Sequence, residues 1–192
     1  IESILQEAGL KTASYTSPHL HQYNERIRVQ GEAVTDEQLC KTFTDVEQGR
    51  QGTTLSFFEF GTLAALWIMQ KSDIDVAILE VGLGGRLDAV NIVDPDVSVI
   101  TSIAVEHSAW LGNNVEEIGR EKAGILRRNT PAVYGDKLPP GSIVEIAREL
   151  NVRLYIQDTD FEYVLGTSSV WSWRGISANN VALEHLNLPV PT

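Results

Sequence analysis

Apolar residues occur in short and in longer runs along the chain, and each kind of run indicates a different kind of element. Residues 75–81 and 97–104 are short, almost wholly apolar runs rich in β-branched residues, which is typical of buried strands in a parallel sheet. Residues 56–70 are apolar around most of a helical circumference, which predicts a helix packed on several sides. The succession of these two kinds of run predicts a chain in which strands and helices alternate.

Polar residues beside these runs indicate where helices begin. Thr35 and Gln38 have the spacing of a capping box, and Val34 and Leu39 have the spacing of a hydrophobic staple. The further expected elements are extended runs at 12–17 and 25–30, a helix at 115–126 with Asn114 and Glu117 at its start, a helix at 141–150, and strands at 131–135 and 152–157. This order predicts an α/β fold with a doubly wound, mostly parallel sheet that has helices on both faces. Residues 161–175 predict a small antiparallel hairpin near the C-terminus.

Composition narrows the class of partner. The chain has 192 residues, 43% of them apolar, and a formal net charge of −11, so it is long enough to bury one full core. Lys and Arg are scattered, which excludes the basic stripe that nucleic acid or anionic lipid requires. No apolar run approaches the length of a membrane span and no secretory leader is visible, so we expect a cytoplasmic protein. The single cysteine, Cys40, is predicted to be a small buried hydrophobic residue.

The sequence patterns at both ends of the chain are those of structure that continues beyond the given residues. Residues 1–9 begin without a methionine, inside an amphipathic helical pattern that Gly9 closes. Residues 185–192 run into prolines, as a hinge to a further domain would. We therefore expect the chain to be a piece of a longer protein.

Polar side chains occur where the expected strands end, which is where ligands bind in open α/β sheets. Ser17 ends the first strand, Glu80 ends the apolar run at 75–81, and Glu106 and His107 follow the next strand. A hydroxyl and a carboxylate at one edge of a sheet suit a hard divalent cation such as Mg²⁺, although a histidine is an unusual ligand for it. The alternative, which the pattern alone favours, is a turn at Ser17, a strand-end carboxylate at Glu80 and a loop histidine at His107.

A glycine-rich stretch follows Glu80. It is not a dinucleotide-binding motif, because Leu87 stands where the last glycine of G-x-G-x-x-G is required, and the chain has no G-K-[ST] of a phosphate-binding loop. Glycines allow positive φ angles and close approach of the backbone to a ligand. Arg86 and Asp88 are expected to project polar groups into the same space, and the alternative is a structural turn with a surface Arg–Asp pair.

Six sequence blocks carry a resemblance to a known family. They are TSPHL (16–20), ERIRVQG (25–31), FFEFGTLAAL (57–66), EVGLGGRLDAVN (80–91), TSIAVEH (101–107) and IGREKAGI (118–125). In this order and spacing they resemble the folylpolyglutamate synthases of the Mur ligase superfamily, and in particular the bacterial bifunctional dihydrofolate synthase/folylpolyglutamate synthases. The resemblance implies an ATP-dependent ligase that uses Mg²⁺ and adds L-glutamate to dihydropteroate, to a (tetrahydro)folate or to both, through an acyl phosphate.

The resemblance also implies roles for individual residues. Ser17, Glu80 and His107 match positions that hold Mg²⁺ in the family, and Lys122 matches a lysine that is carbamylated there and orients the metal, so His107 and Lys122 are the implied catalytic residues. Without the resemblance, a lysine in a helix between charged neighbours is typical of a solvated face.

The implied substrate-binding residues are Phe58, Arg86 and Asp88. Phe58 and Asp88 match positions that bind the pterin part of dihydropteroate in the bifunctional enzymes. On its own pattern, Phe58 would be assigned to the hydrophobic core.

The resemblance further implies that residues 1–192 are part of the central ATPase domain of a monomeric enzyme. The family's P-loop and its C-terminal domain are not in this sequence, so no ATP-binding residue is assigned and the chain alone is expected to be inactive. Two alternatives stay open. One is another amino-acid ligase of the superfamily, acting on a cell-wall precursor, and the other is a non-catalytic binding module of the same fold.

Overall fold

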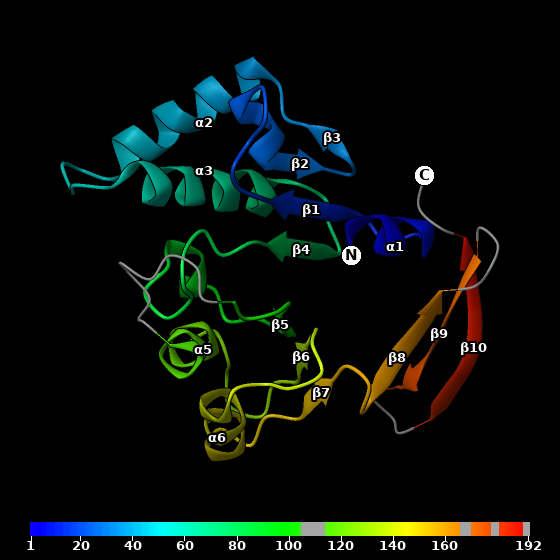
Figure 1. The fold of residues 1–192 in the computed structure, drawn as a ribbon. Coiled ribbons are helices and arrows are strands. Elements are labelled where there is room, and N and C mark those ends of the chain that lie inside the picture. Colours follow the sequence, from blue (N-terminus) through cyan, green and yellow to red (C-terminus); the bar gives the residue numbers. More distant parts are fainter. Residues whose placement is uncertain (105–113, 166–169, 178–180, 190–192) are drawn as a thin grey trace. The chain divides into compact units, whose positions relative to one another are not determined.

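The computed structural model describes residues 1–104, 114–165, 170–177 and 181–189. These form two compact units, Ile1–Val93 and Asp94–Thr192 (Figure 1). Each unit combines helices with a sheet that contains parallel strand pairs, which confirms the predicted α/β class. None of the described helices is long and apolar enough to cross a membrane.

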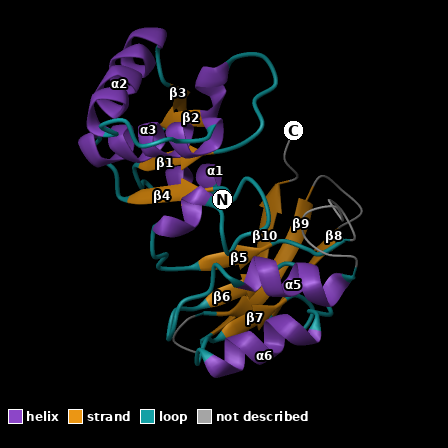
Figure 2. Ribbon diagram, turned by 90° about the vertical axis from the view of Figure 1, so that its left-hand side faces the viewer, coloured by secondary structure: helices purple, strands orange, loops and turns teal. Residues whose placement is uncertain are grey.

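The first unit is built on a four-stranded sheet in the order β3-β2-β1-β4. Its elements are α1 (Glu2–Glu7), β1 (Thr12–Tyr15), the 3₁₀ helix η1 (Tyr23–Arg26), β2 (Ile27–Val29), β3 (Glu32–Ala33), α2 (Asp36–Gly49), α3 (Phe57–Lys71), β4 (Val76–Leu79) and the 3₁₀ helix η2 (Ala89–Ile92). Strand β1 pairs parallel with β4 and antiparallel with β2. Helices α2 and α3 lie along the sheet together, as Figures 1 and 2 show.

Strand β1 is buried on both faces, and its sequence alternates accordingly. Thr12 and Ser14 face α1, where Gln6 Nε2 donates to Thr12 Oγ1 (3.0 Å) and Ser14 Oγ donates to Glu2 Oε1 (3.2 Å). The opposite face of β1 joins the core, which consists of Ala13, Tyr15, Ile27, Val34, Leu39, Ala65, Ile68, Met69 and Val90. Helices therefore cover both faces of this sheet, as predicted.

The start of α2 confirms the predicted capping box. Thr35 Oγ1 accepts from the N–H of Gln38 (3.2 Å), and Gln38 Oε1 accepts from the N–H of Thr35 (2.9 Å). Val34 and Leu39 are both buried in the core, as expected of a hydrophobic staple. The prediction for Cys40 was wrong, because its side chain is exposed. Cys40 lies one residue beyond Leu39, which turns it about 100° around the helix and away from the buried face.

The second unit contains two sheets. Its elements are β5 (Ser98–Ile100), α5 (Val115–Ala123), β6 (Ala132–Tyr134), α6 (Gly141–Glu149), β7 (Leu154–Ile156), β8 (Phe161–Leu165), β9 (Val170–Ile176) and β10 (Ala182–Pro189). Strands β5, β6 and β7 form a parallel sheet, and β8 to β10 form an antiparallel one in the order β10-β9-β8. The predicted hairpin is therefore part of a three-stranded sheet, and Ala182–Pro189 forms a strand where the sequence suggested the beginning of a hinge.

Helices α5 and α6 are joined at their N-terminal ends by one carboxylate. Glu116 accepts hydrogen bonds from the N–H groups of Gly141 (3.0 Å) and Ser142 (2.7 Å), while Asn114 caps α5 as predicted. The hydrogen bond from Ser142, followed by that from Gly141, lowers the pKa of Glu116 below its ordinary value. Glu116 thus supplies the side-chain acceptor that α6 lacks at its own N-cap, Pro140.

We expect Glu116→Ala to lower the free energy of unfolding at neutral pH and to matter less in acid. Since the pKa of Glu116 is lower in the folded state, its contribution is present above the unfolded pKa and is lost as the pH falls through the folded value. Urea unfolding at about pH 7 and about pH 3 measures this difference. Glu145→Ala, at an exposed position of α6, is the control. A cost that is the same at both pH values would contradict the prediction.

Candidate functional site

The carboxyl ends of β1 and β4 bring two of the predicted residues into contact. Tyr15 pairs with Leu79 in the parallel register, and the N–H of Glu80 continues the ladder by donating to Tyr15 O (2.9 Å). The N–H of Ser17 donates to Glu80 Oε2 (2.6 Å). The peptide bond that follows Ser17 is cis. The predicted meeting of Ser17 and Glu80 at this edge is therefore present in the structure.

The oxygen atoms at this contact suit a hard cation. Among the residues that the structure describes, neither Ser17 Oγ nor Glu80 Oε1 has a hydrogen-bond partner. Mg²⁺ prefers oxygen atoms as ligands, such as those of a hydroxyl group and a carboxylate. The described ranges contain no group of three or more His, Cys, Asp or Glu residues that could hold a metal. A metal here would therefore need further ligands besides these two residues.

The structure does not test the other two residues predicted for metal and catalysis. His107, like Glu106, falls outside the described residues, so its predicted role is not tested. Lys122 lies on α5 in the second unit, and its side chain is half-buried. The structure thus connects Ser17 with Glu80, and the roles of His107 and Lys122 stay predictions.

The side chain of Asp88 holds the glycine-rich loop together through hydrogen bonds to its backbone. Its carboxylate accepts hydrogen bonds from the N–H groups of Gly82 (3.1 Å), Leu83 (3.0 Å) and Val90 (2.9 Å). Gly84 has a positive φ of 71°, which favours glycine. The expected use of glycine for unusual backbone angles is thus confirmed. The structure also gives Asp88 a role in holding the loop, which the sequence offered only as the alternative of a structural turn.

Phe58 lies directly against Gly82. A Cβ atom on Gly82 would lie 2.5 Å from Phe58 Cζ, so the ring occupies the space that a side chain would need. On its other side, the ring centroid of Phe58 lies 5.8 Å from that of Tyr15 in the core. Phe58 is half-buried and packs against the core cluster, so it supports the glycine loop from below. Its predicted contact with substrate is a separate role that this packing leaves untested.

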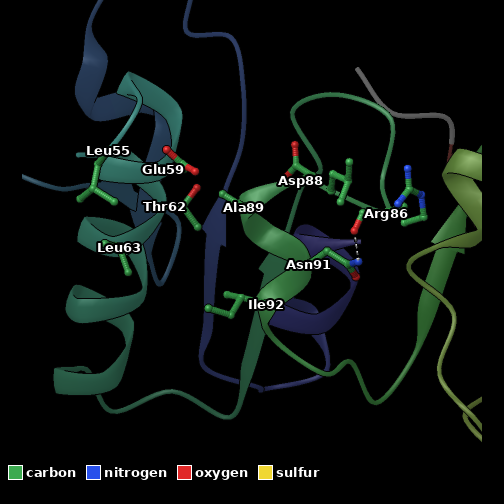
Figure 3. A pocket seen from close by; sticks show the side chains of 10 residues that line it. Leu55, Glu59, Thr62, Leu63, Arg86, Asp88, Ala89, Asn91 and Ile92 are labelled. Carbon is green, nitrogen blue, oxygen red and sulfur yellow. Dashed lines mark hydrogen bonds between the residues drawn. The ribbon is translucent and has the colours of Figure 1, made fainter. Parts of the chain in front are cut away.

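A cavity of about 460 Å³ opens between α3 and η2 in the first unit (Figure 3). It is lined by Leu55, Glu59, Thr62, Leu63, Arg86, Leu87, Asp88, Ala89, Asn91 and Ile92. Two predicted substrate residues, Arg86 and Asp88, line this cavity, and Phe58 does not. The wall from α3 was not predicted from the sequence, although Glu59, Thr62 and Leu63 have the spacing of a single helical face.

Two further residues that the sequence did not single out hold the loop after Ser17. The carboxylate of Glu25 accepts hydrogen bonds from the N–H groups of Leu20 (2.8 Å), His21 (2.9 Å) and Gln22 (2.7 Å). These bonds, that from Leu20 first, lower the pKa of Glu25, so the carboxylate is charged at neutral pH. The second residue is Arg26, which donates from Nε to the imidazole of His19.

Arg26 is a buried cation. Its side chain is 9% exposed, and its Nε donates to Nδ1 of His19 (2.8 Å). The guanidinium carbon lies 5.4 Å from the ring centroid of Tyr23 and 5.7 Å from that of Phe57. Two aromatic faces and one imidazole thus stabilise this charge within the described structure.

Comparison with known proteins shows which proteins this chain is similar to. No family profile matches the chain. The chain is 46% identical over 190 residues to the dihydrofolate synthase/folylpolyglutamate synthase of Escherichia coli (strain K12), which covers 99% of this chain and 44% of the relative. The chain is homologous to the bacterial folylpolyglutamate synthases. The corresponding protein of Haemophilus influenzae is 41% identical over 186 residues, covering 97% of this chain and 41% of its own length.

Solved structures agree with this assignment. Escherichia coli FolC in complex with DHPP and ADP superposes with a TM-score of 0.91 at 45% identity, covering 99% of this chain and 44% of that one. The bifunctional folylpolyglutamate synthase/dihydrofolate synthase from Yersinia pestis, complexed with AMPPNP and Mn ion, superposes with a TM-score of 0.89 at 46% identity, covering 99% and 45%. This chain therefore spans less than half the length of these relatives, and its predicted resemblance to the family is confirmed.

We expect Gly82→Ala to destabilise the first unit of this chain. The added methyl group would overlap Phe58, and overpacking of this kind costs about 1–3 kcal/mol of unfolding free energy. Gly49→Ala is the control, because an added Cβ there meets nothing within 4 Å. Urea denaturation of both variants measures the difference. Adding Phe58→Ala to Gly82→Ala should recover the part of the cost that comes from the overlap, and strictly additive costs would contradict this explanation.

Proposed function

We propose that this chain is part of an ATP-dependent ligase that joins L-glutamate to dihydropteroate, to a (tetrahydro)folate or to both. The observation that carries the proposal is the similarity over 99% of the chain to dihydrofolate synthase/folylpolyglutamate synthases. In the proposed reaction a substrate carboxylate oxygen attacks the γ-phosphorus of ATP, and the bond to ADP breaks. The amine of glutamate then attacks the acyl carbon of the acyl phosphate, phosphate leaves, and the amine loses a proton.

The ligands in the solved relatives support each component of this reaction. The Escherichia coli structure holds DHPP and ADP, and a structure of a bifunctional synthase holds Mn, AMPPNP and L-glutamate. These ligands include a nucleotide, a divalent metal and the amino acid to be added. We propose that the protein to which this chain belongs uses ATP, Mg²⁺, glutamate and a dihydropteroate or folate acceptor, in the cytoplasm and as a monomer.

We propose that Ser17 and Glu80, with His107, hold Mg²⁺ beside the transferring phosphoryl group. The metal would neutralise the charge that develops on the phosphoryl oxygens. Ser17 Oγ and Glu80 Oε1 lie at one strand edge and have no hydrogen-bond partner in the part of the chain that the structure describes, which supports this assignment. For Lys122 we propose the carbamylated form, in which the neutral amine adds CO₂ and releases a proton. The resulting carboxylate-like group would orient the metal.

We propose that the cavity between α3 and η2 receives the pterin part of the acceptor. Its apolar walls, including Leu55, Leu63 and Ile92, suit the faces of a flat ring, and its polar groups suit the ring's hydrogen-bonding edge. Arg86 and Asp88 contribute from the glycine loop, and Phe58 fixes that loop from below. We further propose that residues 1–192 form part of the central ATPase domain.

Release of ADP by the whole protein tests the proposed function. The assay contains MgATP and glutamate, with dihydropteroate, a tetrahydrofolate or a muramyl-peptide precursor as the acceptor. Release with dihydropteroate is expected, and release with tetrahydrofolate as well would show a bifunctional enzyme. Release with only the cell-wall precursor would assign the protein to another branch of the superfamily. Absence of release with all three acceptors would favour a non-catalytic binding module.

We expect Glu80→Gln in the whole protein to reduce kcat by about 100-fold or more, the order of loss found when a transition-state charge is left unbalanced. The amide has nearly the same size as the carboxylate but lacks the charge that a divalent cation requires. Glu7→Gln, at an exposed carboxylate on α1, is the matched control and should keep its activity. Full activity of Glu80→Gln would contradict the proposed metal site.

A further inference from the structure

The segment from Ser17 to Gln22 has little regular structure of its own. It follows Thr16, the first residue after β1, whose N–H donates to Arg26 O (2.9 Å) and closes the base of the loop. The loop then extends away from the sheet, and Leu20 at its far side is 85% exposed. The conformation of this segment therefore depends on side chains that reach it from outside.

Glu25 is one residue outside the segment whose side chain holds it. One carboxylate accepts the N–H groups of three consecutive loop residues, Leu20, His21 and Gln22, at 2.7 to 2.9 Å. Hydrogen bonds to an ionised acceptor are about twice as strong as neutral ones. The three N–H groups converge on one anion, which fixes the path of the backbone more tightly than a single bond would.

The same turn of η1 contributes a second contact. Arg26 Nε donates to Nδ1 of His19, which lies between Ser17 and the three N–H groups held by Glu25. The loop is thus attached through its base, its middle and its far arm to residues 25 and 26. At its near end, the backbone N–H of Ser17 donates to the side-chain carboxylate of Glu80.

We propose that Glu25 is a positioning residue for the metal site, because it holds the loop from Ser17 to Gln22 in the conformation that places Ser17 beside Glu80. The inference rests on the proposed role of Ser17 and Glu80 as metal ligands. Glu25 contacts neither of them, and it acts on Ser17 through the backbone between them. Loss of an outer group that orients a metal ligand typically weakens metal binding about 10–100-fold.

The three N–H groups lie in an exposed loop, so water replaces Glu25 as their partner when the carboxylate is removed. The global fold should then lose little, while the loop loses its fixed path. This separates a positioning role from a merely structural one. A structural role would lower overall stability and leave the metal affinity of the folded protein unchanged.

The test uses the whole protein with Glu25→Gln and Glu25→Asp. Gln keeps the length but presents an NH₂ group to N–H donors, and Asp keeps the charge but is one methylene shorter. Glu47→Gln is the matched control, because it removes a carboxylate paired with Arg50 on α2, outside the loop. Three quantities are measured: hydrogen exchange of the amides in residues 17–22, the dissociation constant for Mn²⁺ by electron paramagnetic resonance, and the Mg²⁺ dependence of ADP release.

For Glu25→Gln we expect faster exchange in residues 17–22 and Mn²⁺ binding weakened by about 10-fold or more. The Mg²⁺ concentration for half-maximal ADP release should rise in parallel, with kcat at saturating Mg²⁺ little changed. Glu25→Asp should lie between Glu25→Gln and the native protein, and Glu47→Gln should match the native protein in all three measurements.

Two results would overturn the inference. Unchanged amide exchange in Glu25→Gln would show that the carboxylate does not hold the loop. Faster exchange with unchanged Mn²⁺ affinity would show that the loop does not position a metal ligand. Exchange and Mn²⁺ binding need no turnover, so they decide the inference even if the native protein releases no ADP, a result that would instead reject the proposed ligase activity.

Discussion

The parallel pairing of β1 with β4 is the constraint on which the candidate site depends. Strand β1 contributes to a buried layer on each of its faces, so its register with β4 is fixed by side chains on both sides of the sheet. A shift of one residue would exchange the face that meets α1 with the face that meets the core. Because that register is fixed, Ser17 and Glu80 leave the sheet at the same level and meet.

The core and the glycine loop are connected through one aromatic ring. Phe58 packs on Tyr15 at one side and on Gly82 at the other. Helix α3, which carries Phe58, also forms one wall of the cavity, and η2 forms the facing wall. The core is thus connected through α3 both to the glycine loop and to one wall of the cavity.

Carboxylates that accept backbone N–H groups recur at the irregular parts of this acidic chain. Asp88 closes the glycine loop, Glu25 holds the loop after Ser17, and Glu116 joins α5 to α6. The chain carries 26 Asp and Glu against 15 Lys and Arg, and these three acidic residues have a structural use that needs no basic partner. Partial positive charge on clustered N–H groups is sufficient to hold a carboxylate in each case.

The sequence by itself determined the features that depend on near neighbours. Helix starts such as Thr35 with Gln38 were predictable because a capping box involves residues three positions apart, and the strands at 76–79 and 98–100 followed from unbroken apolar runs. The six sequence blocks indicated the family, and the strand ends indicated Ser17 and Glu80 as neighbours. The roles of His107 and Lys122 remain predictions.

Only the tertiary structure decided the exposure of Cys40, the third strand of the antiparallel sheet, the engagement of Asp88 by backbone N–H groups and the cavity wall from α3. Each of these depends on which face of an element meets another element. Ser17 and Glu80 are 63 residues apart, and their hydrogen bond forms only once the strands are in register. Periodicity indicates that an element has a buried face, but packing against the rest of the chain selects its partner.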